Sequence, residues 1–189
     1  MAQAANNPHL PARISLRPAS AADSDFLYQV YCSTRQDEMA PWGWSEAQKS
    51  AFLRMQYEIR QRGYAAAYPA AEYSVILVEG SCGGSMILSR GPGEIRLVDI
   101  AILPEFRNRG VGQYLIKMLL SEASGSRMAL RLSILRGNRA AHLYERLGLT
   151  AVGGDAMYCE MECVPAESQA GASVSNSSWE SISNARKSE

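Results

Sequence analysis

The spacing of apolar and polar residues predicts two helices in the first third of the chain. Between Ser20 and about Arg35, apolar side chains recur three or four positions apart, which is the period of a helix with one buried face. Ser45 and Gln48 form a capping box, so a second helix is expected from Glu46 to about Arg62.

Strands are expected where β-branched and apolar residues cluster between turn residues. The expected strands are Ile14 to Arg17, Tyr73 to Val78, Ser85 to Ser89, Ile95 to Leu103, Ala129 to Leu135, one near Ala151, and Met157 to Glu162. The second and third are expected to form a hairpin across Gly80-Ser81-Cys82-Gly83. With a helix after the fourth strand and another after the fifth, the predicted order is β-α-α-β-β-β-α-β-α-β-β.

The segment from Val98 to Leu119, VDIAILPEFRNRGVGQYLIKML, carries the most chemical information. An apolar strand ends at Pro104, a basic turn with two glycines follows, and a helical pattern begins. The first N–H groups of a helix have no partner within it, and the helix dipole adds about half a positive charge there. Glycines let an anion approach the backbone, and Arg107 and Arg109 add positive charge. The segment therefore predicts a pyrophosphate-binding turn.

Two common phosphate-binding motifs do not fit this turn. No Lys-Ser or Lys-Thr follows Gly112, as a nucleotide-triphosphate loop requires, and the G-x-G-x-x-G spacing of a dinucleotide fingerprint is absent here. The pattern R-x-x-G-x-G from Arg107 to Gly112 resembles the acyl-CoA-binding signature of the GNAT superfamily of N-acetyltransferases. Alternatively, this segment is an ordinary basic turn between a strand and a helix, in which the glycines only allow a tight backbone and bind no cofactor.

A second segment supports the same resemblance. Residues Asn138 to Leu149 read NRAAHLYERLGL and resemble the other GNAT hallmark, N-x-x-A-x-x-L-Y-E-x-L-G-F, with one position fewer between Asn138 and Leu143 and with Leu149 replacing the final aromatic residue. The same residues also predict an ordinary short helix that Asn138 caps and Gly148 ends. The resemblance is firm from about Ile95 to Val152. It implies an α/β (α+β) GNAT acyl-CoA N-acyltransferase fold, with helices flanking a mixed, mostly antiparallel sheet.

The resemblance implies acetyl-CoA as co-substrate and assigns the residues that bind it. The backbone of the strand end, at Ile102 and Leu103, would pair with the pantetheine arm and the thioester. The pyrophosphate would be held by the turn and its arginine side chains, that is by Arg107, Asn108, Arg109, Gly110, Val111 and Gly112. Asn138 would hydrogen-bond the cofactor from the second motif.

The resemblance also assigns the catalytic residues. Tyr144 would be the general acid, because a phenol with a pKa of ~10 can protonate a departing thiolate with a pKa of ~8.5; a half-buried aromatic with a bonded hydroxyl is the alternative. Asp99 is the lone carboxylate within an apolar strand and is the candidate base. An ion pair of Asp99 with Arg96 or Arg131 is the competing interpretation, and Glu94 is the reserve base.

The acceptor site is expected at the first two helices and their connection. The charged and aromatic residues that cluster there are Arg35, Asp37, Glu38, Trp42 and Trp44. The tryptophans suit stacking on an amine, and they suit packing of the loop onto the sheet equally well.

Composition narrows the class of protein. The 189 residues predict a flexible leader (1–12), one GNAT domain (13–164) and a disordered serine-rich tail (165–189). With 19 basic and 19 acidic residues, neither nucleic acid nor a membrane is expected as a partner. Four cysteines without a C-x-x-C pair and two histidines predict no metal site, and free thiols favour the cytoplasm.

These observations lead to one favoured function and two alternatives. We expect transfer of an acetyl group from acetyl-CoA to a primary amine of a small molecule or peptide, by direct attack in a ternary complex. A protein N-terminal or lysine acetyltransferase is the second hypothesis, and a catalytically silent acyl-CoA-binding module is the third. A homodimer is left open, since many GNAT relatives dimerise through their last strands.

Overall fold

A computed structural model describes residues 13–35, 39, 41 and 43–165, and the structural statements below concern these residues. The predicted leader and the predicted tail beyond residue 165 lie outside them. The domain boundaries at residues 13 and 164 therefore stay predictions.

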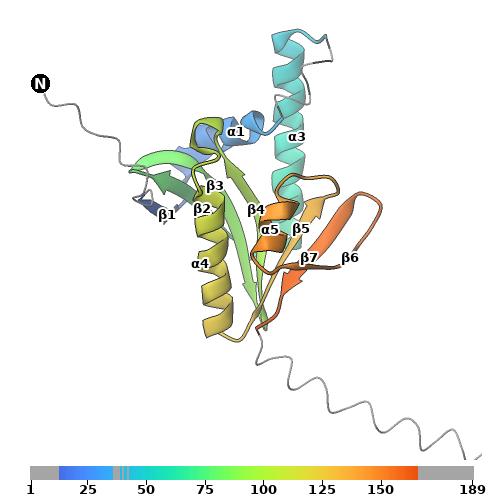
Figure 1. The fold of residues 1–189 in the computed structure, drawn as a ribbon. Helices are drawn as coiled ribbons and strands as arrows, with labels where there is room; N and C mark the ends of the chain where they lie inside the picture. The colour runs from blue at the N-terminus through green and yellow to red at the C-terminus, as the bar shows by residue number, and fades with distance from the viewer. Residues whose placement is uncertain (1–12, 36–38, 40, 42, 166–189) are drawn as a thin grey trace, which may run out of the picture.

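A mixed sheet of seven strands in the order β1-β2-β3-β4-β5-β7-β6 runs through the described part of the chain (Figure 1). The strands are β1 (Ile14–Pro18), β2 (Glu72–Val78), β3 (Ser81–Gly91), β4 (Glu94–Ile102), β5 (Ala129–Leu135), β6 (Thr150–Gly154) and β7 (Tyr158–Cys163). Neighbouring strands are antiparallel except β4 and β5, which are parallel. The predicted fold class and the predicted order of elements are confirmed.

Helices lie on both faces of this sheet. The helices are η1 (Ala21–Asp23), α1 (Ser24–Ser33) and α3 (Glu46–Ala67) on one face, then η3 (Pro104–Phe106), α4 (Val111–Gly125) and α5 (Ala141–Arg146). The capping box of α3 is confirmed, because the N–H of Gln48 donates to Ser45 Oγ and the N–H of Ser45 donates to Gln48 Oε1 at 2.9 Å. This helix continues to Ala67, beyond the predicted end near Arg62.

The hairpin between β2 and β3 differs from the prediction. Its turn consists of Glu79 and Gly80, which both have positive φ angles, 54° and 83°, as a two-residue type I′ turn requires. Ser81 and Cys82 belong to β3, and a bulge at Gly83 keeps the following residues in register with β2. The cluster of small residues suggested a longer turn because a bulged strand and a loop have similar compositions.

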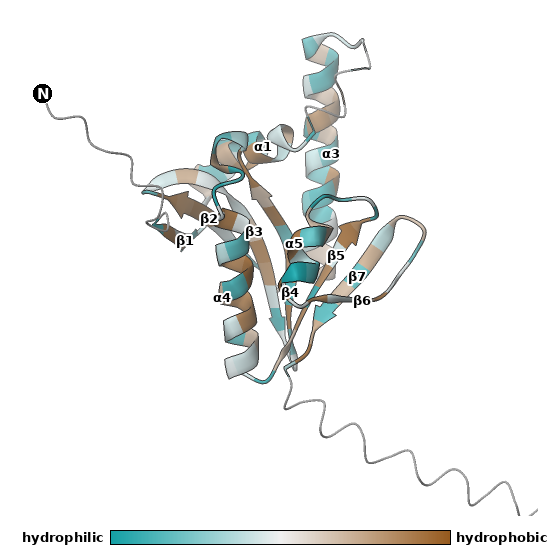
Figure 2. Ribbon diagram, viewed as in Figure 1, coloured by the Kyte–Doolittle hydropathy of each residue, from teal (hydrophilic) through white to brown (hydrophobic). Residues whose placement is uncertain are grey.

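The main hydrophobic core fills the space between the sheet, α4 and α5. Leu115 and Leu119 of α4 pack there with Ile95 of β4 and Tyr144 of α5. Figure 2 shows the apolar residues concentrated on the central strands and along one side of α4. On the opposite face of the sheet, Val30 of α1 forms a smaller cluster with residues at the end of β4.

The parallel strands β4 and β5 separate toward their carboxyl ends. Their pairing runs from Glu94–Ala129 to Leu97–Leu132, although both strands continue further, and Figure 1 shows the two arrows diverging. The N–H of Leu103 donates to Gly83 O of β3. Because backbone groups of successive strand residues point alternately to the two sides, those of Ile102 face the gap between β4 and β5. On its β5 side, β4 pairs with no described strand beyond Leu97.

A β-bulge in β4 determines which face of the sheet Asp99 takes. Ile87 of β3 pairs with Asp99, whereas the next residue, Leu88, pairs with Leu97, so that Val98 is the extra residue. Before the bulge the odd-numbered residues of β4 lie in the main core, and after it the even-numbered residues pack against that core. Asp99 therefore points to the other face, toward α1 and α3.

The close approach of β3 to β4 gives a testable prediction. A Cβ at Gly84 would lie 2.2 Å from the carbonyl oxygen of Ala101, whereas a Cβ at Gly91 on the same strand has no heavy atom within 4 Å. Gly84→Ala should lower the free energy of unfolding by about 1–3 kcal/mol, and Gly91→Ala should change it by less than about 0.5 kcal/mol. Urea unfolding measures both, and equal midpoints would contradict the observed strand spacing.

Candidate active site

Asp99 is held on the α3 side of the sheet by Arg60. Arg60 Nη2 donates to Asp99 Oδ1 at 2.5 Å, and Arg60 Nε donates to the hydroxyl of Tyr64 at 2.9 Å. Burial raises the pKa of Asp99 above its ordinary value, and the positive charge of Arg60 opposes part of that rise. Asp99 is thus a partly desolvated carboxylate beside a fixed cation.

The partner of Asp99 is not one that the sequence suggested. Arg96 and Arg131 instead form ion pairs across β4, β5 and β7, with Glu94, Glu160 and Glu162. The predicted pairing of Asp99 with Arg96 or Arg131 is therefore wrong. Glu94, the reserve base, lies in these ion pairs at the other end of β4 from Ile102.

Tyr144 approaches the gap between β4 and β5 from the other face of the sheet. The residue is 5% exposed, and burial raises the pKa of its phenol to about 12, with a further contribution from the negative charge of Asp99. Tyr144 belongs to the main core between the sheet, α4 and α5, whereas Asp99 lies on the α3 side of the sheet. No described residue forms a hydrogen bond with the Tyr144 hydroxyl. A carboxylate and a protonated phenol therefore flank the same gap.

The basic turn leads from β4 into α4. Asn108 and Gly110 both have positive φ angles, 58° and 78°, and Gly110 precedes the first residue of the helix. The N–H of Tyr114 donates to Gly110 O as the first bond of the helix, so the N–H groups of residues 111–113 have no partner within it. These free amides and the helix dipole make the end of α4 suitable for an anion.

Gly112 places this helix end beside the gap. A Cβ at this position would lie 3.6 Å from side-chain atoms of both Ile102 in β4 and Leu143 in α5. The first turn of α4, the end of β4 and α5 therefore meet at one place. A larger side chain than alanine would not fit between them.

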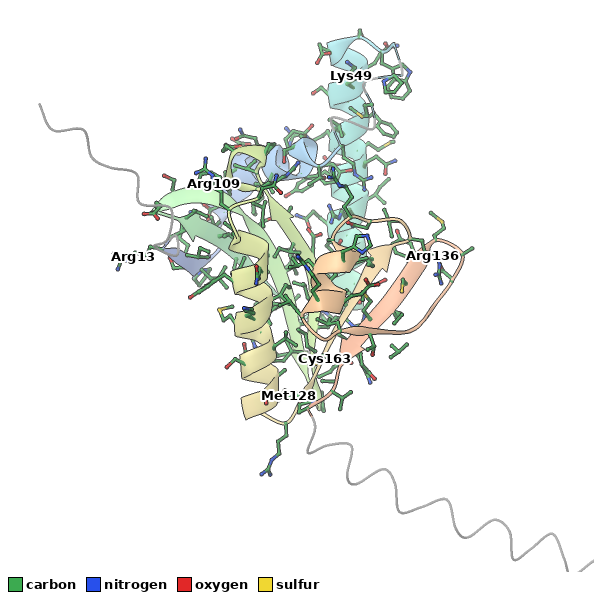
Figure 3. The ribbon with its side chains drawn as sticks, viewed as in Figure 1. Arg13, Lys49, Arg109, Met128, Arg136 and Cys163 are labelled. Carbon is green, nitrogen blue, oxygen red and sulfur yellow. The ribbon has the colours of Figure 1, made fainter. Side chains whose placement is uncertain are left out.

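The remaining predicted cofactor residues surround the same place. Arg107 Nε donates to Ile102 O at 2.8 Å and its Nη2 to Ser33 O at 3.3 Å, so this guanidinium binds carbonyl groups. The guanidinium of Arg109 lies over the ring of Phe106, beside the first turn of α4 (Figure 3). Asn138 Oδ1 accepts a hydrogen bond from the N–H of Ala140, ahead of α5.

The expected acceptor residues are only partly within the described chain. Asp37, Glu38 and Trp42 lie outside it. Trp44 is 38% exposed and its ring packs edge-on against Phe52 at a centroid distance of 5.3 Å. Trp44 thus packs within its own helical segment.

A cavity that the sequence analysis missed lies between the sheet and the two helices α1 and α3. Its volume is about 30 Å³, and its polar and aromatic lining includes Tyr31, Tyr57, Arg60, Tyr64, Tyr73 and Asp99. The sequence of α3 contains a signal for this cavity, because its lining residues recur at helical spacing on one face. These residues are Tyr57, Arg60, Gln61 and Tyr64.

Two kinds of feature are absent from the described residues. No group of three or more histidine, cysteine or acidic side chains is arranged there to hold a metal ion. None of the helices is long and apolar enough for a membrane span.

Comparisons with known proteins agree with this geometry. Residues 59–149 match the family model of the acetyltransferase (GNAT) domain. A search of curated proteins found no match. The structure is similar to that of the PaiA N-acetyltransferase from Thermoplasma acidophilum in complex with coenzyme A, with 17% sequence identity, 80% of this chain and 98% of that chain covered, and a TM-score of 0.60.

Two further solved structures share the fold. One is described as histone acetyltransferase HPA2 and related acetyltransferase from Corynebacterium glutamicum (23% identity, 81% and 97% covered, TM-score 0.57). The other is the ribosomal-protein-S18-alanine N-acetyltransferase from Escherichia coli (18% identity, 80% and 93% covered, TM-score 0.55). The chain has the GNAT fold, and its residues 59–149, which include both sequence motifs, match the acetyltransferase (GNAT) domain.

The environment of Tyr144 gives a prediction about stability. Because the pKa of Tyr144 rises from 10.0 to about 12 on folding, its contribution to stability is complete below pH 10 and is lost as the pH rises to about 12. Tyr144→Phe cannot ionise and should therefore lose less stability than the natural protein over this interval. Urea unfolding of both proteins at several pH values measures the difference, and parallel pH dependences would contradict the burial of this phenol.

Proposed function

We propose that this protein is an acetyl-CoA-dependent N-acetyltransferase that acetylates a primary amine of a small molecule or peptide by direct attack in a ternary complex. One observation carries the proposal. Asp99 and Tyr144 flank the gap between β4 and β5 from opposite faces of the sheet, and the unpaired edge of β4 lies between them. A base and an acid on the two faces of the sheet beside one strand edge suit a reaction in which one proton leaves the nucleophile and another reaches the leaving group.

The residues around the gap fit the cofactor that this reaction needs. The backbone of Ile102 faces the gap and suits an amide of the pantetheine arm, while the N–H of Leu103 is already bound to Gly83. The pyrophosphate would lie against the free amides of residues 111–113, with Arg109 beside them. Arg107 would have to turn from Ile102 O to reach the phosphates, and Asn138 retains the N–H groups of its amide for the cofactor.

The roles of the catalytic side chains follow from their environments. Acetyl-CoA supplies the acetyl thioester. Asp99 takes a proton from the amine as the new C–N bond forms, and its raised pKa makes it a stronger base than an exposed carboxylate. Tyr144 gives its proton to the sulfur as the C–S bond breaks, and its raised pKa keeps it protonated at neutral pH.

The state of the cysteines bears on the compartment in which the protein resides. Within the described residues, the thiols of all four cysteines, Cys32, Cys82, Cys159 and Cys163, are free. Free thiols support a reducing compartment, and we place the protein in the cytoplasm on this ground. A homodimer through the last strands stays a prediction.

Removal of the Tyr144 hydroxyl tests the proposed acid. Tyr144→Phe should lower kcat by about 10²-fold or more and leave the Kd for acetyl-CoA nearly unchanged, because the hydroxyl acts on the departing sulfur. Thiol release with a panel of amines, amino acids and peptides measures turnover, and a thermal shift with acetyl-CoA measures binding. Undiminished turnover would remove Tyr144 from the mechanism. Binding without release by the natural protein would favour a silent acyl-CoA-binding module.

Two substitutions at Gly110 test the pyrophosphate position. Asn and Asp both tolerate a left-handed backbone and have nearly the same shape, so Gly110→Asn and Gly110→Asp differ mainly in charge. Gly110→Asp should weaken acetyl-CoA binding by about tenfold or more relative to Gly110→Asn, because its carboxylate would repel the pyrophosphate. Isothermal titration calorimetry measures both Kd values. Equal affinities would place the phosphates elsewhere.

A further inference from the structure

We propose that the acceptor is an α-amino acid, with Arg60 binding its carboxylate and Asp99 receiving its amine. The inference rests on the proposed function, because it assigns the acceptor class of the same site. It starts from one juxtaposition, a fixed cation and a fixed anion side by side at the edge of the cavity between the sheet, α1 and α3.

Arg60 has hydrogen-bonding capacity that the fold does not use. A guanidinium has five N–H groups. Here Nε donates to Tyr64 and Nη2 donates to one oxygen of Asp99, and no described residue accepts a hydrogen bond from Nη1. The side chain is 27% exposed and lines the cavity. Arg60 can therefore bind a second carboxylate without releasing its present partners.

The guanidinium of Arg60 is also fixed in position. Its central carbon lies 5.4 Å from the ring centroid of Tyr31 in α1 and 5.1 Å from that of Tyr64 in α3. Contacts with aromatic rings on two helices limit the conformations of this long side chain. A preorganised guanidinium loses less entropy when it binds a carboxylate, and its planar shape favours that group.

The charge arrangement matches an amine and a carboxylate on one carbon. In an α-amino acid the N–Cα and Cα–C bonds are each about 1.5 Å long, so its two charged groups are immediate neighbours. Arg60 Nη2 and Asp99 Oδ1 are likewise neighbours, 2.5 Å apart. A polyamine or a second ammonium group would instead face Arg60 and be repelled. The pair thus selects for a carboxylate and against a second cation.

The cavity limits how much of the acceptor enters it. Its volume of about 30 Å³ is larger than the roughly 10–15 Å³ that a single water molecule needs. No described residue forms a hydrogen bond with the hydroxyls of Tyr73 or Ser85, which line it. A small polar group such as a carboxylate fits this space. The carboxylate end of the acceptor would enter, and its nitrogen would stay at Asp99.

The reaction is balanced with this acceptor. The ammonium group of the amino acid first gives one proton to water; the neutral nitrogen then forms a bond to the acetyl carbon and loses a second proton to Asp99, while the thioester C–S bond breaks and the sulfur takes a proton from Tyr144. The products are an N-acetyl amino acid and the free thiol of coenzyme A.

Matched acceptors test the inference. The common L-amino acids are screened with acetyl-CoA by thiol release, and each active one is compared with its primary amide, which has the same side chain and no negative charge. We expect kcat/KM to be at least about tenfold higher for the amino acid than for its amide, because only the carboxylate pairs with Arg60. Equal or faster acetylation of the amides would overturn the proposal.

Variants of Arg60 separate recognition from a structural effect. Because Arg60 also contacts Asp99, the measure is the ratio of kcat/KM for the amino acid to that for its amide. Arg60→Gln should lower this ratio by at least about tenfold, and Arg60→Lys should restore part of it. Arg54→Gln, on the same helix and outside the cavity lining, is the matched control and should keep the full preference. A preference that survives in Arg60→Gln would overturn the assignment of Arg60.

The screen also distinguishes this inference from the function on which it rests. Acetylation of peptides or polyamines with no transfer to amino acids would overturn the acceptor class and leave the N-acetyltransferase intact. No transfer to any amine would overturn both.

Discussion

The separation of β4 from β5 beyond the Leu97–Leu132 pair is the constraint on which the site depends. Two parallel strands that stayed paired would have no free backbone groups between them, because each N–H and C=O would be used in the ladder. The divergence leaves the β5-facing edge of β4 unpaired beyond Leu97. Asp99 and Tyr144 belong to opposite faces of the sheet, and in the proposed mechanism both act on a thioester bound at this edge.

Burial, more than the ion pair of Asp99 with Arg60, determines the pKa values of the two proposed catalytic side chains. Burial raises the pKa of both Asp99 and Tyr144, and the effect exceeds the opposing attraction between Asp99 and Arg60. Arg60 therefore moderates the carboxylate without removing its basicity. The same cation keeps free N–H groups at the cavity, so one side chain serves both the base and the acceptor.

Local patterns in the sequence predicted the elements well, because helical spacing, the Ser45–Gln48 capping box and the glycine turn before α4 act over a few residues. The expected roles of the strand end at Ile102 and of Tyr144 come from the resemblance of the two motifs to the GNAT family. The contact of Arg60 with Asp99 spans 39 residues and depends on a bulge at Val98 that no spacing rule indicates. Without that extra residue, Asp99 would continue the odd-numbered face of β4 into the main core.

Backbone hydrogen exchange with and without acetyl-CoA tests the central claim most directly. If the cofactor lies along the open edge of β4 and against the first turn of α4, exchange should slow at the amides of Ile102 and Gly112. Exchange at Gly80, in the turn between β2 and β3, should stay unchanged. Saturating acetyl-CoA that leaves Ile102 and Gly112 exchanging at their original rates would contradict the account.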